Sequence, residues 1–222
     1  EEHYAALASS NPELTASDRD YKQETTAINK ATLIYNPTHI YSKEPWVWYQ
    51  IQYLMEHASE RNYIHTPYAV LSKDMYDGLA AVVAKVPDTT MLLNSTSVGD
   101  NFMASSDYTL NRPKILNTGV KLYEYFGDRS SHGKSILIDH RLALVGSYNL
   151  DMRSTYLDTE TMLVIDGEEF NSQLENCIDD LVSDSLLVSP DGTYENNPAV
   201  CVIPVSDSKK LIFAFTSLLF QL

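Results

Sequence analysis

Basic residues are scarce in this sequence. Among 222 residues there are 16 lysines and arginines against 30 aspartates and glutamates, so the formal net charge at pH 7 is −14. A broad nucleic-acid surface needs clustered basic side chains to neutralise phosphates. The charge therefore argues against such a surface, and we expect no nucleic-acid partner. One anionic group can still be bound, because a small local cluster of basic side chains is enough for a single phosphate.

Cysteine is also rare, with Cys177 and Cys201 as the only two. Two cysteines allow at most one disulfide, and they exclude a disulfide framework or a cysteine-rich zinc site. Histidine, aspartate and glutamate do not recur with the spacing of a metal site either. We therefore expect neither a metal nor another cofactor.

Long apolar runs are missing. No stretch of 18 apolar residues occurs, so the sequence predicts no membrane-spanning helix. The nearest is the twelve-residue run 211–222, LIFAFTSLLFQL. We favour a C-terminal helix docked on the core, and contact with a membrane surface is the alternative. No signal peptide is recognisable, and the chain begins with Glu1 instead of Met, so we expect it to be part of a longer protein.

Strand-like and helix-like segments alternate along most of the chain. Short apolar segments typical of strands cover 31–35, 63–66, 89–93, 120–126, 135–138, 142–145 and 159–165. Helical spacing of apolar residues covers 44–61, 72–86, 108–117 and 167–181. The stretch 94–107 is polar and is interpreted as a loop. The alternation predicts an α/β fold, with a β-sheet flanked by helices on both faces.

The segment 131–151, SHGKSILIDHRLALVGSYNLD, carries the candidate chemistry. Its fixed positions follow the pattern HxKx4Dx6GSxN: His132, Lys134, Asp139, Gly146, Ser147 and Asn149. Six matches at this spacing arise by chance on the order of once in 10⁵ such chains or more rarely. The pattern is therefore a strong signal.

The residue types suit a phosphodiester. On an extended segment, His132 and Lys134 are two positions apart and face the same side. The imidazole can supply a nucleophile or a proton near neutral pH. The ammonium can stabilise charge on the non-bridging oxygens.

The second half of the motif supplies hydrogen bonds and a turn. Asn149, on the turn after the second strand, can donate to the same phosphate oxygens, and Ser147 can donate another hydrogen bond. Gly146 permits a sharp turn or a close backbone approach. Asp139 falls on the turn between two strands, where we expect it to hold structure.

On these residues the chain is identified as a member of the phospholipase D superfamily. Further blocks resemble its bacterial cardiolipin synthase-like members: TPYAVLSKDMYDGLAAV (66–82), NSTSVGDNFMASSDY (94–108), KILNTGVKLYEYFG (114–127) and GSYNLDMRSTYLDTETMLVID (146–166). The resemblance covers about 33–187 and looks like the C-terminal half of a two-motif protein. It implies the layered phospholipase D-like fold and three parts. These are a polar N-terminal arm or lead-in (1–30), a catalytic half-domain with one HxKx4D motif (31–190), and a C-terminal loop with an apolar helix (191–222).

The resemblance also implies a mechanism. In such proteins two HxK motifs share one pocket, and one histidine attacks phosphorus to form a phosphohistidine while the other protonates the leaving alcohol. The second motif tends to supply the acid/base, which would be His132 here. Glu160, 28 residues after His132, would hydrogen-bond the imidazole and orient it, with Asp158 as the alternative. The five other histidines are interpreted as structural: His3, His39, His57, His65 and His140.

Residues 1–131 contain no second HxK. The chain thus holds a half-site, and the other half belongs either to an upstream domain or to a second copy related by a twofold axis. The family implies phosphatidyl transfer on membrane phospholipids by a membrane-associated full-length bacterial protein. The alternatives are a homodimeric phosphodiesterase or nuclease of the same superfamily, and a non-catalytic lipid-binding half-domain.

Overall fold

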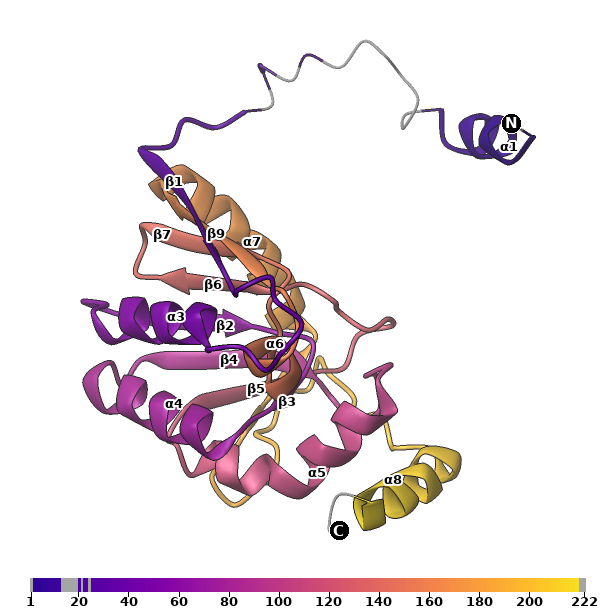
Figure 1. Ribbon diagram of the computed structural model, residues 1–222. Coiled ribbons are helices and arrows are strands. Elements are labelled where there is room, and N and C mark those ends of the chain that lie inside the picture. The colour runs from indigo at the N-terminus through magenta and orange to yellow at the C-terminus, as the bar shows by residue number, and fades with distance from the viewer. Residues whose placement is uncertain (1, 13–19, 21, 24, 220–222) are drawn as a thin grey trace.

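The computed structural model describes residues 2–12, 20, 22–23 and 25–219. In this part of the chain, an eight-stranded sheet has the order β1-β9-β7-β6-β2-β4-β5-β10 (Figure 1). Its strands are β1 (Lys30–Tyr35), β2 (Asn62–His65), β4 (Thr89–Asn94), β5 (Lys121–Tyr125), β6 (Ser135–Ile138), β7 (Leu142–Gly146), β9 (Thr161–Asp166) and β10 (Ser185–Val188). Strands β2, β4 and β5 are parallel, and the other neighbours are antiparallel. A small parallel pair joins β3 (Ala69–Val70) to β8 (Leu150–Asp151).

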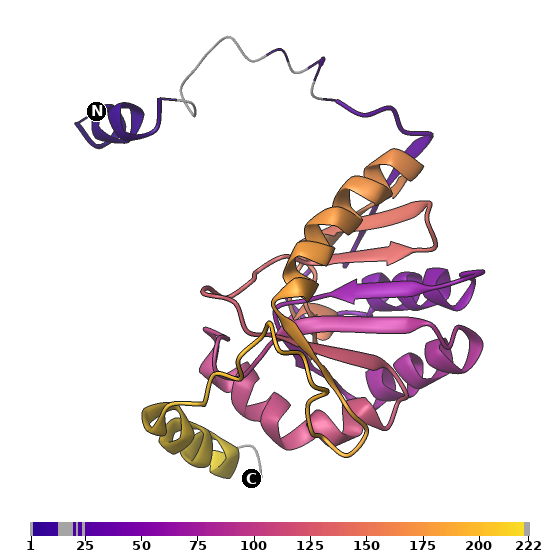
Figure 2. The same ribbon diagram turned by 180° about the vertical axis from the view of Figure 1, so that it is seen from behind.

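Helices cover both faces of the large sheet. Helices α3 (Trp46–Glu56) and α4 (Lys73–Lys85) lie on the face seen in Figure 1, and α7 (Glu168–Ser183) lies on the face seen in Figure 2. The described residues also form α1 (Glu2–Ser10), α5 (Phe102–Leu116), α6 (Met152–Tyr156) and α8 (Asp207–Leu219). The predicted mixed sheet with helices on both faces is confirmed.

The apolar core lies on both sides of the sheet. Against α3 and α4, the largest fully buried side chains include Trp48, Ile51 and Leu79. Against α7, Leu92 of β4 packs in a second cluster with Ile178. Every residue of β4 is buried, because a central strand with helices on both faces has no solvent side.

The first turns of α5 were not predicted. The polar composition of 94–107 indicated a loop up to residue 108, but α5 begins at Phe102. The side chain of Asn101 caps it, accepting a hydrogen bond from the Ala104 amide at 3.1 Å. Ser106 is buried and its hydroxyl accepts from Thr216 of α8 at 2.8 Å, so serines here serve helix packing.

Other boundaries also differ from those predicted. Helix α3 ends at Glu56, well before residue 61, and β3, β8, α6 and β10 were not predicted. Residues 211–219 of the apolar run form the end of α8, which packs on α5, and residues 220–222 lie outside the described part. Much of 13–24 in the predicted arm also lies outside it. Within the described residues, no helix combines the length and apolar character needed to cross a membrane.

Candidate active site

Three neighbouring strands bring the motif residues to one end of the sheet. Strand β6 begins directly after Lys134, β7 ends at Gly146, and β9 begins directly after Glu160. The register pairs Ser135 with Val145, and Gly146 with Met162. The amide of Gly146 also donates to the carbonyl of Lys134 at 3.3 Å. Lys134, Gly146 and Glu160 thus lie at the same edge of the sheet, because an antiparallel strand begins where its neighbour ends.

His132 and Lys134 form the centre of the site. The Lys134 Nζ atom lies 2.8 Å from Nδ1 of His132 and 2.8 Å from its carbonyl oxygen. An ammonium group only donates, so Nδ1 is the acceptor in this contact. The His132 side chain is exposed and that of Lys134 is half-buried. A phosphodiester arriving from solvent can therefore reach both groups.

The electrostatics of Lys134 combine burial with nearby acids. Burial lowers the pKa of the ammonium, while the charges of Glu160, Asp100 and Asp151 act to raise it. The net shift is downward. A partly desolvated ammonium gains more from an approaching phosphate than a fully hydrated one does.

Asn149 lies on the turn after β7, as predicted from its place in the motif. Its backbone amide and its Nδ2 atom each lie 3.3 Å from the Ser154 hydroxyl. Its Oδ1 atom is buried and has no hydrogen-bond partner among the described residues. An amide oxygen only accepts, so the atom of this side chain that could donate to a phosphate is Nδ2, which here lies against the Ser154 hydroxyl.

Glu160 is buried at the edge of the site, but its partners are not the predicted ones. Its carboxylate accepts hydrogen bonds from the hydroxyls of Ser147 and Ser154, the latter at 2.7 Å. The predicted bond to His132 is not formed among the described residues, although each carboxylate oxygen keeps a further acceptor position. Ser147, for which we predicted a bond to phosphate, likewise donates to Glu160. The alternative, Asp158, pairs with Arg153 at 3.0 Å.

Asp139 lies at the far end of β6, away from His132. Its carboxylate accepts backbone N–H bonds from Ser59, Glu60 and Arg61 at 2.8 to 3.1 Å. Burial acts to raise the carboxyl pKa, but the three N–H donors outweigh burial and lower it. Asp139 thus ties the connection before β2 to the β6–β7 turn, where its φ is 53°.

Gly146 is required by a close approach of two strands. A Cβ atom there would lie 2.8 Å from the Cα atom of Met162 and would collide with the backbone oxygen of Thr161. Real side chains do not tolerate such contacts. The glycine of the motif therefore allows β7 and β9 to converge where the site forms.

His65 is a part of the site that the sequence interpretation missed. It ends β2, is 7% exposed, and its Nε2 atom lies 2.9 Å from the hydroxyl of Ser131, next to His132. A Cβ on Gly133 would lie only 2.5 Å from the His65 ring. Burial, followed by the charge of Lys134, lowers the pKa of His65 to about 4. No local pattern marks His65, because only strand pairing places it beneath the motif.

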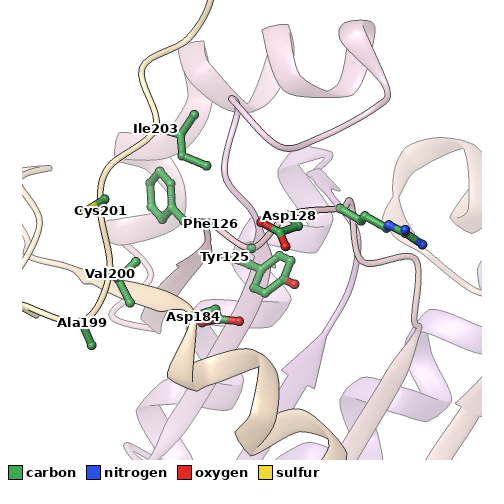
Figure 3. A pocket seen from close by; sticks show the side chains of 10 residues that line it. Tyr125, Phe126, Asp128, Asp184, Ala199, Val200, Cys201 and Ile203 are labelled. Atoms are coloured by element: carbon green, nitrogen blue, oxygen red, sulfur yellow. The ribbon is translucent and has the colours of Figure 1, made fainter.

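One cavity lies near His132, and a second is lined in part by residues 125–129, which precede the motif in the chain. An apolar cavity of about 540 Å³ is walled in part by Tyr68, whose ring stands edge-on to His132 with 6.4 Å between centroids. A second cavity of about 620 Å³ separates the end of β5 from residues 199–203 (Figure 3). None of the motif residues lines this second cavity. Among the described residues, no three His, Cys, Asp or Glu side chains are grouped to hold a metal.

Comparison with known proteins decides the family. Residues 51–182 match the family described as cardiolipin synthase, PLD-like domain. The chain belongs to this family. It is 34% identical over 131 residues to cardiolipin synthase A of Yersinia pseudotuberculosis serotype O:1b (strain IP 31758), and equally to that of Yersinia pestis bv. Antiqua (strain Angola). These matches cover 59% of this chain, and the chain spans about a quarter of the relatives' length, 26%.

Solved structures share the phospholipase D-like fold with this family member. Phosphatidylserine synthase of Haemophilus influenzae Rd KW20 has a TM-score of 0.61 at 16% identity, over 88% of this chain and 48% of that one. Nuc of Salmonella typhimurium, a phospholipase D family member, has a TM-score of 0.58 at 17% identity, over 71% of this chain and 97% of that one. At these identities the likeness concerns the fold.

Proposed function

We propose that this chain supplies one half-site of a phosphatidyl-transferring enzyme that acts on membrane phospholipids through a phosphohistidine. The observation that carries the proposal is the contact of Lys134 with His132 at the end of the sheet where β7 leads into Asn149, in a member of the cardiolipin synthase family. The full-length relatives named cardiolipin synthase A support a phospholipid substrate.

In this proposal His132 is the general acid and base. The histidine of the other half attacks phosphorus, the bond from phosphorus to the leaving alcohol breaks, and its electron pair stays on the alcohol oxygen. His132 gives that oxygen a proton. The acceptor alcohol then returns a proton to His132 as it attacks the phosphohistidine, which frees the nucleophile.

Substrate binding must rearrange Lys134. To act as an acid, the ring of His132 must carry protons on both nitrogens, but Nδ1 now accepts from Lys134. The non-bridging oxygens of a bound phosphodiester give the ammonium better acceptors. Once Lys134 turns to them, Nδ1–H can donate to a further acceptor position of Glu160, beside the hydroxyls of Ser147 and Ser154. The predicted role of Glu160 as the orienting group then applies to the substrate-bound state.

The second half-site comes from another domain or another copy. The 222 residues hold one HxK motif. The chain aligns with 48% of the phosphatidylserine synthase chain but with 97% of Nuc. This coverage supports one domain as the repeating unit, and the 26% share of the cardiolipin synthases leaves room for a partner domain in the full-length protein.

A lipid substrate is favoured over nucleic acid by charge and by the surface beside the site. The net charge is −14, and Asp100 and Asp151 stand near Lys134, where they would repel neighbouring phosphates of a polynucleotide. A phospholipid presents a single phosphodiester, and the apolar cavity begins at Tyr68 beside His132.

Turnover by the full-length protein distinguishes the three candidate functions. Phosphatidylglycerol, bis(p-nitrophenyl) phosphate and DNA are offered in parallel, with His39→Ala as a matched variant of an exposed histidine outside the site. We expect turnover of phosphatidylglycerol by the wild type and by the matched variant. Turnover of DNA without any phospholipid would support the nuclease alternative, and turnover of none would support a lipid-binding half-domain.

A further inference from the structure

The apolar cavity beside His132 is formed by three short elements. Its walls come from β3 and the preceding Tyr68, from the first turns of α5, and from α6 with the residue that follows it. Met103 is 56% exposed, Met152 42% and Leu157 58%. Large apolar side chains are thus held in solvent around a hollow of about 540 Å³, a volume typical of ligand sites.

The polar side chains of the cavity already have partners inside the protein. The Asn101 oxygen caps α5, Asp151 accepts from the Ser154 amide at 2.6 Å, and Asp107 bonds Asn111 at 3.0 Å. The other polar pairs are Arg153 with Asp158, Tyr156 with Ser72, and Tyr68 with Asn101. Each of these side chains is thus held by a partner, although Arg153 uses only its Nε atom and the carboxylates keep further acceptor positions. The rest of the lining is hydrocarbon and methionine sulfur, which adapt to flexible apolar ligands.

We infer that this cavity binds the hydrocarbon chain of the phosphodiester lipid whose phosphate sits at His132 and Lys134. The inference rests on the proposed function and names the part of the substrate that this surface recognises. Tyr68 joins the two regions, since its ring lines the cavity and stands edge-on to His132. Each methylene that leaves water for this surface stabilises the complex, so affinity rises with the length of the lipid chain.

Methionine oxidation gives a readout that does not depend on activity. The chain has six methionines, of which Met55, Met75, Met91 and Met162 are at most 1% exposed. Met103 and Met152 both line the cavity. The full-length protein is treated with dilute peroxide alone, with dioctanoyl phosphatidylglycerol, or with glycerophosphoglycerol, which has the same head group without chains. Oxidation at each methionine is followed by mass spectrometry.

We expect dioctanoyl phosphatidylglycerol to slow oxidation of Met103 and Met152 by about threefold or more, and glycerophosphoglycerol to leave it unchanged. Equal rates in all three conditions would overturn the inference. If Met103 and Met152 oxidise as slowly as the four buried methionines before any lipid is added, the inference is overturned too. The cavity would then be assigned to contact with the other half-domain.

Chain-length preference tests the same surface in turnover. The kcat/KM ratio for dioctanoyl over dibutyryl phosphatidylglycerol is compared in the wild type, Met103→Glu and Met152→Glu. Ile40→Glu is the matched control, because Ile40 is 91% exposed and lies outside the cavity. We expect the ratio to fall about tenfold in the two cavity variants and to stay unchanged in the control. An unchanged ratio in both cavity variants overturns the inference but leaves the proposed function standing. Absence of lipid turnover by the wild type overturns the proposed function itself.

Discussion

The Nε2 atom of His65 lies 2.9 Å from the hydroxyl of Ser131, the residue that precedes His132. The same buried ring leaves no room for a side chain on Gly133. A histidine at the end of β2 therefore supports both sides of His132 without belonging to the motif.

The low pKa of His65, about 4, predicts a pH-dependent stability. The unfolded chain takes up this proton near pH 6.5, whereas the folded protein resists it until about pH 4. The free energy of unfolding is therefore unaffected above pH 6.5 and falls by about 3 kcal/mol from this group as the pH drops to 4. Urea titrations at pH 7 and pH 4 should show that His65→Gln loses this part of the pH dependence. The control His39→Gln, at an exposed histidine, should keep this pH dependence. An equal change in the free energy of unfolding between pH 7 and pH 4 in both variants would contradict the assignment to His65.

Gly133→Ala should impair turnover through His65. The new Cβ would lie 2.5 Å from the ring, so the loop that carries His132 must move. A displacement of this size costs on the order of 10- to 100-fold in kcat. Adding His65→Ala opens the space, and the double variant should recover part of the lost kcat. A double variant no better than Gly133→Ala would mean that the glycine acts for another reason.

Asp139 should matter for stability and much less for chemistry. Asp139→Ala removes the acceptor of three backbone N–H groups, and we expect the free energy of unfolding at pH 7 to fall by about 2 kcal/mol. Asp139→Asn should lose less, since asparagine tolerates the positive φ and keeps one oxygen. The pKa of Asp139 is lowered in the folded protein. Its contribution to the free energy of unfolding is therefore present above about pH 4 and is lost as the pH falls through the folded pKa. A large loss of kcat in folded Asp139→Asn would disprove the structural role.

Glu160→Gln should slow turnover on the order of 10- to 100-fold while Asp158→Asn has little effect. The carboxylate favours the charged form of Lys134 and is the acceptor we assign to His132 in the substrate complex. A shift in the pH profile of kcat is expected with Glu160→Gln, and a purely structural role would not produce it. If Asp158→Asn causes the larger loss, the orienting acid is Asp158.

The motif made the centre of the site predictable, because HxK on an extended segment and GSxN after the next strand are local patterns. The strands of the parallel part of the sheet were predictable from their apolar runs. Helix α4 was predictable from its apolar spacing and the Ser72 cap. The contribution of His65 and the hydroxyl partners of Glu160 depend on which strands become neighbours, and no spacing in the chain encodes that. The start of α5 was missed because its polar residues resemble a loop in composition, whereas buried Ser106 in fact packs against α8.

The most direct measurement is turnover of phosphatidylglycerol by the full-length protein with His132→Ala, set beside His39→Ala. If His132 is the acid and base of the half-site, kcat should fall by about 10³-fold or more while the protein stays folded. The His39→Ala protein should match the wild type. Phospholipid turnover that survives His132→Ala would contradict the assignment of this site.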